Sequence, residues 1–248
     1  MVRGLVQSLR SLATIASHPL SLIPLFVLRN GWRTDFRVGE LTLSARHSDL
    51  TAVSEVGLQG EYAFIRSLNF PDHPLVLDLG ANIGCFAAVV LSACGEAEVH
   101  SVEPSPDTTA VLARNRQRYP ELRWQVHHVA IAERDGTLRF SNEGPSTARR
   151  ISADRGVQVP AESFDTFVRR IAGSRRVFLC KMDIEGAEVP IFAAGSHVLD
   201  QIDHFVIEVH GPPENGQLVE TALASTFRRV QLISGRLSKK PVFHASRE

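Results

Sequence analysis

Short apolar segments alternate with amphipathic segments along most of the chain, and the alternation becomes regular in its central and C-terminal parts. Apolar runs too short for helices predict buried strands, whereas apolar residues that recur every three or four positions predict helices. Strands alternating with helices are typical of a parallel sheet covered on both faces. We therefore expect an α/β fold with a doubly wound, mostly parallel sheet. The predicted strands are 75–79, 99–102, 124–131, 137–140, 177–182, 205–209 and 230–233, and the predicted helices are 61–69, 83–93, 106–118, 164–171, 187–199 and 217–224.

The segment 1–70 lacks this regular alternation and is predicted to be an N-terminal extension of a sheet domain at 71–248. Within it, residues 36–45 predict two short strands around a Gly39-Glu40 turn. The extension is expected to cap the domain beside its substrate.

The beginning of the chain is apolar and basic. Apolar residues recur at helical spacing over 2–16, four arginines occur before Thr34, and Asp35 is the first acidic residue. Neither apolar stretch reaches the roughly 20 residues that a membrane-spanning helix needs. An amphipathic helix that packs on the domain is expected. A helix lying on a membrane surface through 1–28, or a targeting peptide, stays open as an alternative.

Composition narrows the classes of partner. The 27 basic residues balance the 27 acidic ones, and the sequence pI is about 7.2, so binding to nucleic acid through bulk charge is not expected. Hydrophobic residues make up 44% of the chain and charged residues 22%, which indicates a globular protein. The three cysteines form no C-x-x-C pair and suit the reducing cytoplasm better than a disulfide framework.

A glycine loop follows the first predicted strand of the sheet. It runs Asp78-Leu-Gly80-Ala-Asn82-Ile-Gly84. Gly80 allows a tight turn, and Gly84 is expected to keep the next helix clear of the ligand. A dinucleotide G-x-G-x-x-G loop would need glycines at 82 and 85, where this chain has asparagine and cysteine. An acid two residues before the first glycine can hold the ammonium group of S-adenosylmethionine (SAM), so SAM fits better than NAD.

A second acid lies at the end of the next predicted strand. Glu103 is followed by Pro104 and comes about 20 residues after the glycine loop, the position from which an acid accepts hydrogen bonds from ribose hydroxyls. Glu103 therefore predicts a binding site for a nucleoside, which both SAM and NAD contain.

Candidate functional residues also lie at the ends of two further predicted strands. Asp183 closes the strand 177–182 and is expected to point into the ligand crevice. Glu185 and Glu188 begin the next helix, where acids are favoured without any further role. Glu208 and His210 share one face at the end of the strand 205–209. His127 and His128 close a further predicted strand, and His128 is a weaker candidate for a contact with adenine or substrate.

Four of these segments together resemble the FkbM family of SAM-dependent methyltransferases. They are Val-Leu-Asp-Leu-Gly-Ala-Asn-Ile-Gly at 76–84, Val-Glu-Pro at 102–104, Lys-Met-Asp-Ile-Glu-Gly-Ala-Glu at 181–188 and Ile-Glu-Val-His at 207–210. The resemblance runs from about Asp49 to Val230 and implies a Rossmann-like methyltransferase sheet. It also implies methylation of a hydroxyl group on a secondary metabolite or a sugar, a small-molecule acceptor.

The resemblance assigns roles to the loop residues. Asp78, Gly80 and Asn82 would line the methionine part of SAM, Glu103 the ribose, and residues 129–131 the adenine. The full set of expected SAM contacts is Asp78, Gly80, Ala81, Asn82, Gly84, Glu103, Pro104 and Ala130.

Methyl transfer to an alcohol requires that the alcohol lose its proton. His210 is the expected base, with Asp183 orienting the hydroxyl or the imidazole and Glu208 beside them. Alternatively, Asp183, Glu208 and His210 could hold a divalent metal ion. Two other classes stay open: an NAD-dependent oxidoreductase, which the glycine spacing opposes, and a scaffold that keeps the fold without catalysis.

Overall fold

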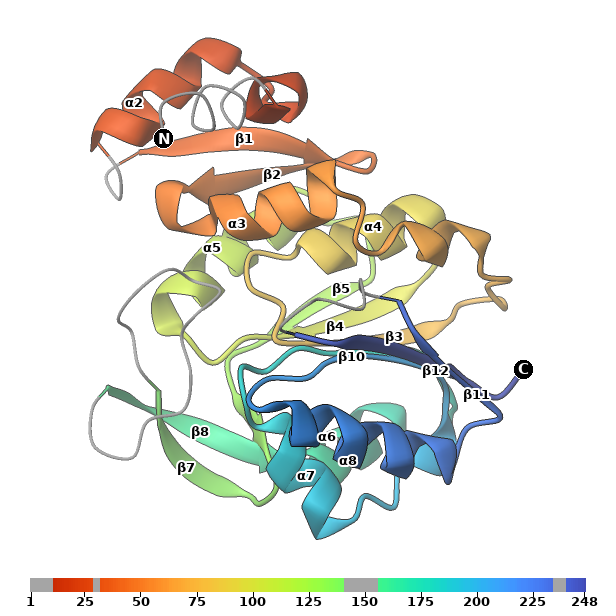
Figure 1. Cartoon of the computed structure of the whole chain (residues 1–248). Helices are drawn as coiled ribbons and strands as arrows, with labels where there is room; N and C mark the ends of the chain where they lie inside the picture. Colours follow the sequence, from red (N-terminus) through yellow and green to blue (C-terminus); the bar gives the residue numbers. More distant parts are fainter. Residues whose placement is uncertain (1–10, 29–31, 141–155, 234–239) are drawn as a thin grey trace.

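A sheet with helices on both faces forms the centre of the molecule (Figure 1). The computed structural model describes residues 11–28, 32–140, 156–233 and 240–248. Among these residues, seven strands form the sheet in the order β11-β12-β10-β9-β3-β4-β5. The strands are β3 (Leu75–Leu79), β4 (Glu98–Val102), β5 (Trp124–His127), β9 (Val177–Met182), β10 (Ile202–Glu208), β11 (Arg229–Leu232) and β12 (Val242–Ser246).

The strand order places a switch point between β3 and β9. From β3 the chain moves outward through β4 and β5, and it then crosses back to β9 on the other side of β3. Strands β3, β4, β5, β9 and β10 are parallel, and β12 runs antiparallel to both of its neighbours. A ligand crevice is expected outside the carboxyl ends of β3 and β9. The predicted α/β, doubly wound, Rossmann-like sheet is confirmed.

The helices divide between the two faces of the sheet. Helices α4 and α5 lie on one face, and α6, α7 and α8 lie on the other (Figure 1). Each face has its own cluster of buried apolar side chains. The strands β3 and β9 are buried throughout, which is why they consist almost entirely of apolar residues. The helices are α4 (Cys85–Ala93), α5 (Pro106–Gln117), α6 (Phe164–Ala172), α7 (Glu188–Ala194) and α8 (Pro213–Ala224).

The N-terminal elements cover the face formed by α4 and α5 (Figure 1). The predicted pair of strands around Gly39 is present as the hairpin β1 (Arg33–Val38) and β2 (Leu41–Arg46). Buried Asn115 on α5 joins this hairpin to the sheet domain: its side chain bonds both the N–H and the C=O of Ser44, and it donates to the carbonyl of Ile83. The hairpin is therefore fixed to the loop that precedes α4.

After β2 the chain makes a series of short helical turns towards β3. They are a 3-10 turn at His47–Asp49, α3 (Leu50–Ala52), a π-helical segment at Val53–Leu58 and a 3-10 turn at Ala63–Ser67. The helix predicted at 61–69 is thus only the last of these turns. The division of the chain at residue 70 stays a prediction about function, because residues on both sides of it share one apolar cluster.

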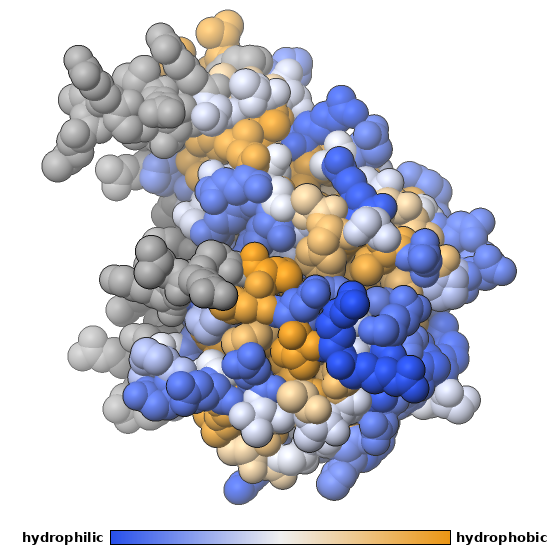
Figure 2. Space-filling model, turned by 45° about the vertical axis from the view of Figure 1, so that its right-hand side comes forward, coloured by the Kyte–Doolittle hydropathy of each residue, from blue (hydrophilic) through white to orange (hydrophobic). Residues whose placement is uncertain are grey.

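The helix predicted near the start of the chain lies partly outside the described residues. Residues 11–15 are helical, and α2 (Leu22–Leu28) packs on the outer side of the hairpin. Leu20, Ile23 and Val27 are exposed. Apolar side chains also reach the surface near the top of the face shown in Figure 2. No described helix is long and apolar enough to cross a membrane.

Two strand predictions need correction. The segment predicted as one strand at 124–131 divides, because β5 ends at His127 and residues 130–132 (β6) join a separate small sheet with β8 (Val157–Ser163) and β7 (Gly136–Phe140). The segment at 230–233 is not the last strand, since β12 follows it and inserts between β11 and β10. Pro160 within β8 and His244 within β12 weaken the apolar pattern that predicts strands.

The predicted helix at 187–199 is shorter than expected. Helix α7 ends at Ala194, where Gly195 has a φ of 78°. A glycine with positive φ is a common end of a helix, because other residues are strained in that conformation.

Candidate active site

The turn after β3 forms the floor of the candidate site. Gly80 has a φ of 78°, and the N–H groups of Gly80 and Ala81 both donate to the carbonyl of Val102 on β4. A Cβ atom at position 80 would overlap the backbone carbonyl of Asp183. Glycine is therefore required both by the conformation and by the close approach of the loop after β9.

The second glycine of the loop allows close packing next to α4. Gly84 has a φ of 96° and precedes α4, and a Cβ there would run into the ring of Trp124. Gly84 is not among the residues that line the cavity described below. It allows α4 to pack on β5, and the predicted contact with SAM stays a prediction. Asn82, with a φ of 51°, does line the cavity.

Glu103 organises the loop that it faces. One carboxylate oxygen accepts a hydrogen bond from the N–H of Asn82 at 3.0 Å, and the other accepts from the N–H of Ser105 at 2.9 Å. That Glu103 also accepts hydrogen bonds from ribose hydroxyls stays a prediction. The predicted nucleoside acid thus lies against the glycine loop and lines the cavity.

We expect the change Glu103→Ala to weaken SAM binding by about 1.5–3 kcal/mol, the range for hydrogen bonds to a charged group. That range corresponds to a rise of roughly 10- to 150-fold in Kd, which isothermal titration can measure. The variant Glu121→Ala removes an exposed glutamate and serves as the control. An unchanged Kd in folded Glu103→Ala would remove the ribose assignment.

One cavity joins the glycine loop to the end of β9. Its empty volume is about 870 Å³, which includes the open mouth. It extends from the predicted adenine side at residues 129–131 to the acids after β9 and on to the N-terminal segment. Its lining comprises Ala52, Glu55, Val56, Glu61, Tyr62, Gly80, Ala81, Asn82, Cys85, Phe86, Val102, Glu103, Pro104, Val129, Ala130, Ile131, Phe140, Lys181, Asp183, Ile184 and Glu185.

Asp78 lies beneath this cavity and does not line it. Its side chain is fully buried, accepts a hydrogen bond from Ser101 at 3.1 Å and lies 3.5 Å from the ammonium of Lys181. Burial raises the pKa of Asp78, and Lys181 opposes that rise. In the structure Asp78 holds Lys181 in place, and its predicted contact with the methionine part of SAM stays a prediction.

Lys181 was not singled out from the sequence, although a lysine within an otherwise apolar strand is unusual. Its ammonium donates to the carbonyl of Gly80 at 2.6 Å and lies 3.7 Å from the carboxylate of Asp183. Burial lowers the pKa of Lys181, but Asp183 and Asp78 more than offset it, so the pKa is raised. Lys181 therefore ties the glycine turn to the acid at the end of β9.

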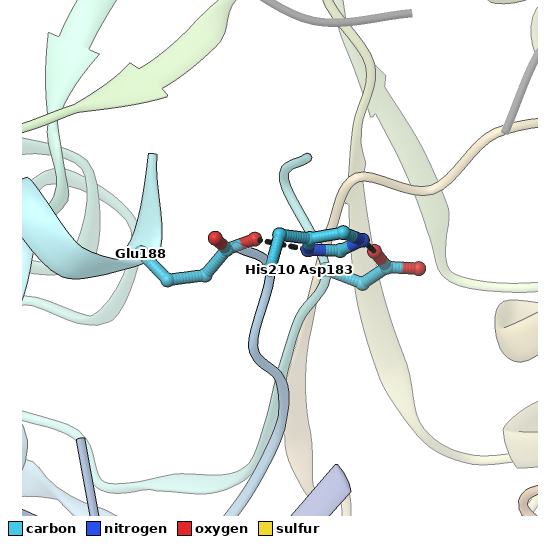
Figure 3. Close-up of side chains that lie close together, drawn as sticks. All are labelled: Asp183, Glu188 and His210. Carbon is cyan, nitrogen blue, oxygen red and sulfur yellow. Dashed lines mark hydrogen bonds and ion pairs between the residues drawn. The ribbon is translucent and has the colours of Figure 1, made fainter. Parts of the chain in front are cut away.

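His210 lies among four carboxylates, and Figure 3 shows two of them, Asp183 and Glu188. Its Nδ1 is 3.1 Å from Glu188, a fully buried side chain that also accepts from the N–H groups of Ile184 and Gly186. Its Nε2 is 3.1 Å from Glu208, 3.3 Å from Glu185 and 3.8 Å from Asp183. The structure thus brings the predicted Asp183, Glu208 and His210 together.

The charge of His210 decides what it can do. Burial lowers its pKa, but the contacts with Glu188 and Glu208 outweigh burial and raise the pKa to about 10. With this pKa the ring is an imidazolium at neutral pH, and an imidazolium carries a proton on each nitrogen and cannot accept another. In this arrangement His210 holds the loops after β9 and β10 together, and Asp183, which lines the cavity, is better placed to receive a proton.

We expect His210→Gln to lower the free energy of unfolding by about 3–5 kcal/mol at pH 6, because buried Glu188 loses its cationic partner. The folded pKa of His210 lies above the ordinary value of 6.5. The imidazolium therefore contributes fully below pH 6.5 and loses its contribution as pH rises through about 10. Urea unfolding of both proteins at pH 6, 8 and 10 should show the difference shrinking, and a constant difference would contradict the ion-pair role.

The predicted metal ligands, Asp183, Glu208 and His210, stay a prediction. Among the described residues, the group whose ligand atoms all lie within 4.8 Å of one another is Asp183, Glu188 and His210. Figure 3 shows the imidazole between the two carboxylates, with Nδ1 towards Glu188 and Nε2 towards Asp183. Nε2 faces Asp183, Glu185 and Glu208, whereas Nδ1 faces Glu188. A ring whose pKa is raised to about 10 would have to lose a proton before either nitrogen could bind a metal ion.

Several cavity residues come from the N-terminal segment. Glu55, Glu61 and Tyr62 were not predicted, because they lie in a segment of irregular turns that gives no periodic pattern. No described residue of 1–34 lines the cavity, and the lining residues of the N-terminal segment lie within 52–62. That this segment caps the substrate stays a prediction. His128 is exposed, lies 3.1 Å from the carbonyl of Pro104 and does not line the cavity.

Comparison with known families gives one match that covers more than half of the chain. The sequence model described as the methyltransferase FkbM domain matches residues 78–234. The matched region begins at the end of β3 and contains the glycine loop, Glu103, Asp183 and His210.

Three curated proteins are similar to this chain, with sequence identities of 24–26%. Hexuronic acid methyltransferase AglP of Haloferax volcanii is 24% identical over 240 residues, 86% of this chain and 92% of that protein. The 2-O-methyltransferase NoeI of Sinorhizobium fredii is 26% identical over 188 residues, 67% of this chain and 76% of that protein. Methyltransferase 1 of Beauveria bassiana is 25% identical over 164 residues, which are 56% of this chain and 66% of that protein.

Among solved structures, precorrin-6y C5,15-methyltransferase of Geobacter metallireducens has a TM-score of 0.48 and 9% identity, covering 77% of this chain and 88% of that chain. This similarity is too low to define the fold, which the strand order of the chain itself establishes.

Proposed function

Because the chain belongs to the FkbM family of methyltransferases, we propose that it transfers the methyl group of SAM to a hydroxyl group of a sugar. The observation that carries this proposal is a single cavity lined by the glycine turn, Glu103 and Asp183. Those residues lie at the carboxyl ends of adjacent strands at the switch point, where such sheets bind their ligands. Two of the similar proteins are named for methylation of a hexuronic acid and of a 2-O position, which supports a sugar acceptor.

When bound, SAM supplies an electrophilic methyl group on its sulfonium. The chain then has to align the acceptor and remove its proton, and alignment alone contributes much of the rate of a displacement. We assign the ribose to Glu103 and the methionine part to the turn at Gly80, Ala81 and Asn82. Pro104 and Ala130 line the part of the cavity assigned to the nucleoside.

Asp183 is the proposed acceptor of the hydroxyl proton. It lines the cavity, and its carboxylate lies within ion-pair distance of Lys181 and His210. Burial raises the pKa of Asp183, which makes it a stronger base than an exposed aspartate, although Lys181 partly opposes the shift. His210 and Glu208 are assigned a positioning role, since they hold the loop beside Asp183 without lining the cavity.

The proposal is tested with ¹³C-methyl SAM and a panel of glycosides. Release of S-adenosylhomocysteine and a new O-methyl signal correlated with a ring carbon are the expected results. A protein that binds SAM but methylates no glycoside would contradict the sugar assignment. Release of no S-adenosylhomocysteine with any alcohol would favour the scaffold alternative.

A further inference from the structure

The cavity is strongly acidic at the end that the proposed function assigns to the acceptor. Five carboxylates and one ammonium line the whole cavity. Glu103 belongs to the nucleoside end, so four acids remain at the other end. Glu55 and Glu61 come from the N-terminal segment, and Asp183 and Glu185 come from the loop after β9.

The cations beside these acids are already engaged. Lys181 donates to the carbonyl of Gly80 and lies between Asp78 and Asp183. Lys240 is 3.0 Å from Glu208, an additional acid behind the cavity lining. The imidazolium of His210 is shared among its four carboxylates. Bound SAM carries a single net positive charge, so the acceptor end keeps an excess of negative charge.

The raised pKa values of two of these acids agree with this excess of negative charge. Burial, followed by the charges of Glu208, Glu55 and Asp183, raises the pKa of Glu61 to about 7. Burial and the charge of Asp183 likewise raise the pKa of Glu185 to about 7. His210 at 3.3 Å and Lys240 at 3.9 Å oppose the rise in the pKa of Glu185, and Lys181 opposes that of Glu61, but burial and the neighbouring acids outweigh these cations.

We propose that the acceptor end of this cavity selects an uncharged sugar and rejects one that carries a carboxylate or a phosphate, with Glu61 as a residue that determines this specificity. The inference rests on the proposed function. A second anion placed among Glu55, Glu61, Asp183 and Glu185 would meet like charges in a partly buried space, and such contacts are unfavourable. Neutral hydroxyl groups, in contrast, donate hydrogen bonds to carboxylates and are favoured there. Repulsion of one acceptor class therefore contributes to specificity together with attraction of the other.

The experiment compares matched pairs of methyl hexosides and methyl hexuronides that differ only at C6, in the gluco, galacto and manno configurations. The full-length protein is assayed at pH 8 and low salt, and kcat/KM is taken from release of S-adenosylhomocysteine. For the configuration used best, we expect kcat/KM of the hexoside to exceed that of the hexuronide by roughly 10-fold or more, equivalent to about 1.4 kcal/mol.

Two isosteric variants test the origin of the selectivity. Glu61→Gln and Glu55→Gln each remove one negative charge from the cavity, and each should narrow the ratio by raising kcat/KM of the hexuronide. Glu40→Gln makes the same change at an exposed position on the β1–β2 turn, and it should leave the ratio within 2-fold of wild type.

The outcomes separate this inference from the function on which it rests. Equal or better use of the hexuronide, or a ratio that neither cavity variant changes, would overturn the charge selectivity while sugar methylation stands. Methylation of none of the six glycosides would count against the proposed sugar acceptor and against this inference together.

Discussion

Replacing Gly80 by alanine is expected to abolish measurable binding of SAM, with a rise in Kd of roughly 100-fold or more, equivalent to about 2.7 kcal/mol. The new methyl group would occupy the position of the carbonyl oxygen of Asp183, and it would also hold an L-residue at a φ of 78°. The turn after β3 and the loop after β9 would have to separate. Isothermal titration with SAM, on protein whose fold is checked by circular dichroism, measures the effect.

Gly95→Ala is the matched control, because a Cβ at Gly95 meets only the carbonyl of Leu91 at 4.0 Å. Its Kd for SAM should stay within about 2-fold of wild type. If Gly80→Ala bound SAM normally, the turn after β3 would not be part of the SAM site. If the variant failed to fold, Asn82→Ala would test the same loop through a side chain that lines the cavity.

The change Asp183→Asn is expected to lower kcat by roughly 10²- to 10⁴-fold, the usual contribution of a positioned general base. The amide has nearly the same shape as the carboxylate but cannot accept a proton. The Kd for SAM should change by less than about 3-fold, since the proposed contacts of SAM lie on Gly80 and Glu103. Single-turnover kinetics and titration with SAM, measured on the same preparation, separate the two effects.

Asp72→Asn, a substitution at an exposed position before β3, provides the control and should retain full turnover. Asp183→Glu keeps the charge, moves the carboxylate by one methylene and is expected to recover part of the activity. Full turnover in Asp183→Asn would exclude Asp183 as the base. Loss of SAM binding in the same variant would instead assign Asp183 to the cofactor site.

The sheet and the strand ends were predictable from the sequence because their patterns are local. Strands β3 and β9 are almost purely apolar, and the chemistry follows each of them within one or two residues, at Gly80 and Asp183. In a parallel sheet such positions meet at one edge. The cavity that joins Gly80, Glu103 and Asp183 agrees with that expectation.

The charge state of His210 could not be predicted in the same way. It depends on Glu188 and Glu208, which lie on different elements, and on burial that no single segment determines. The sequence shows an ordinary histidine after a strand, and its unperturbed pKa makes it a plausible base. Only the assembled contacts make it an imidazolium.

The acids of the N-terminal segment were also beyond the sequence pattern. Glu55 and Glu61 lie in π-helical and turn structure, where polar residues carry no periodic signature. Their position at the cavity follows from how the hairpin is attached to α5 and from no local preference. Similarly, the strands β8 and β12 contain residues that weaken a strand pattern and are held by pairing with their neighbours.

The β1–β2 hairpin is attached through Asn115, and this attachment affects how the range of acceptors could change when segments are exchanged between related chains. Asn115 bonds Ser44 on the hairpin and Ile83 before α4, so a cap taken from another member of the family would inherit its orientation from three elements at once. A replacement bounded by one junction between β2 and α3 and a second one before β3 would leave this attachment intact. It would exchange the segment that carries Glu55 and Glu61 as one cassette, while the methyl-donor half of the molecule keeps its own geometry.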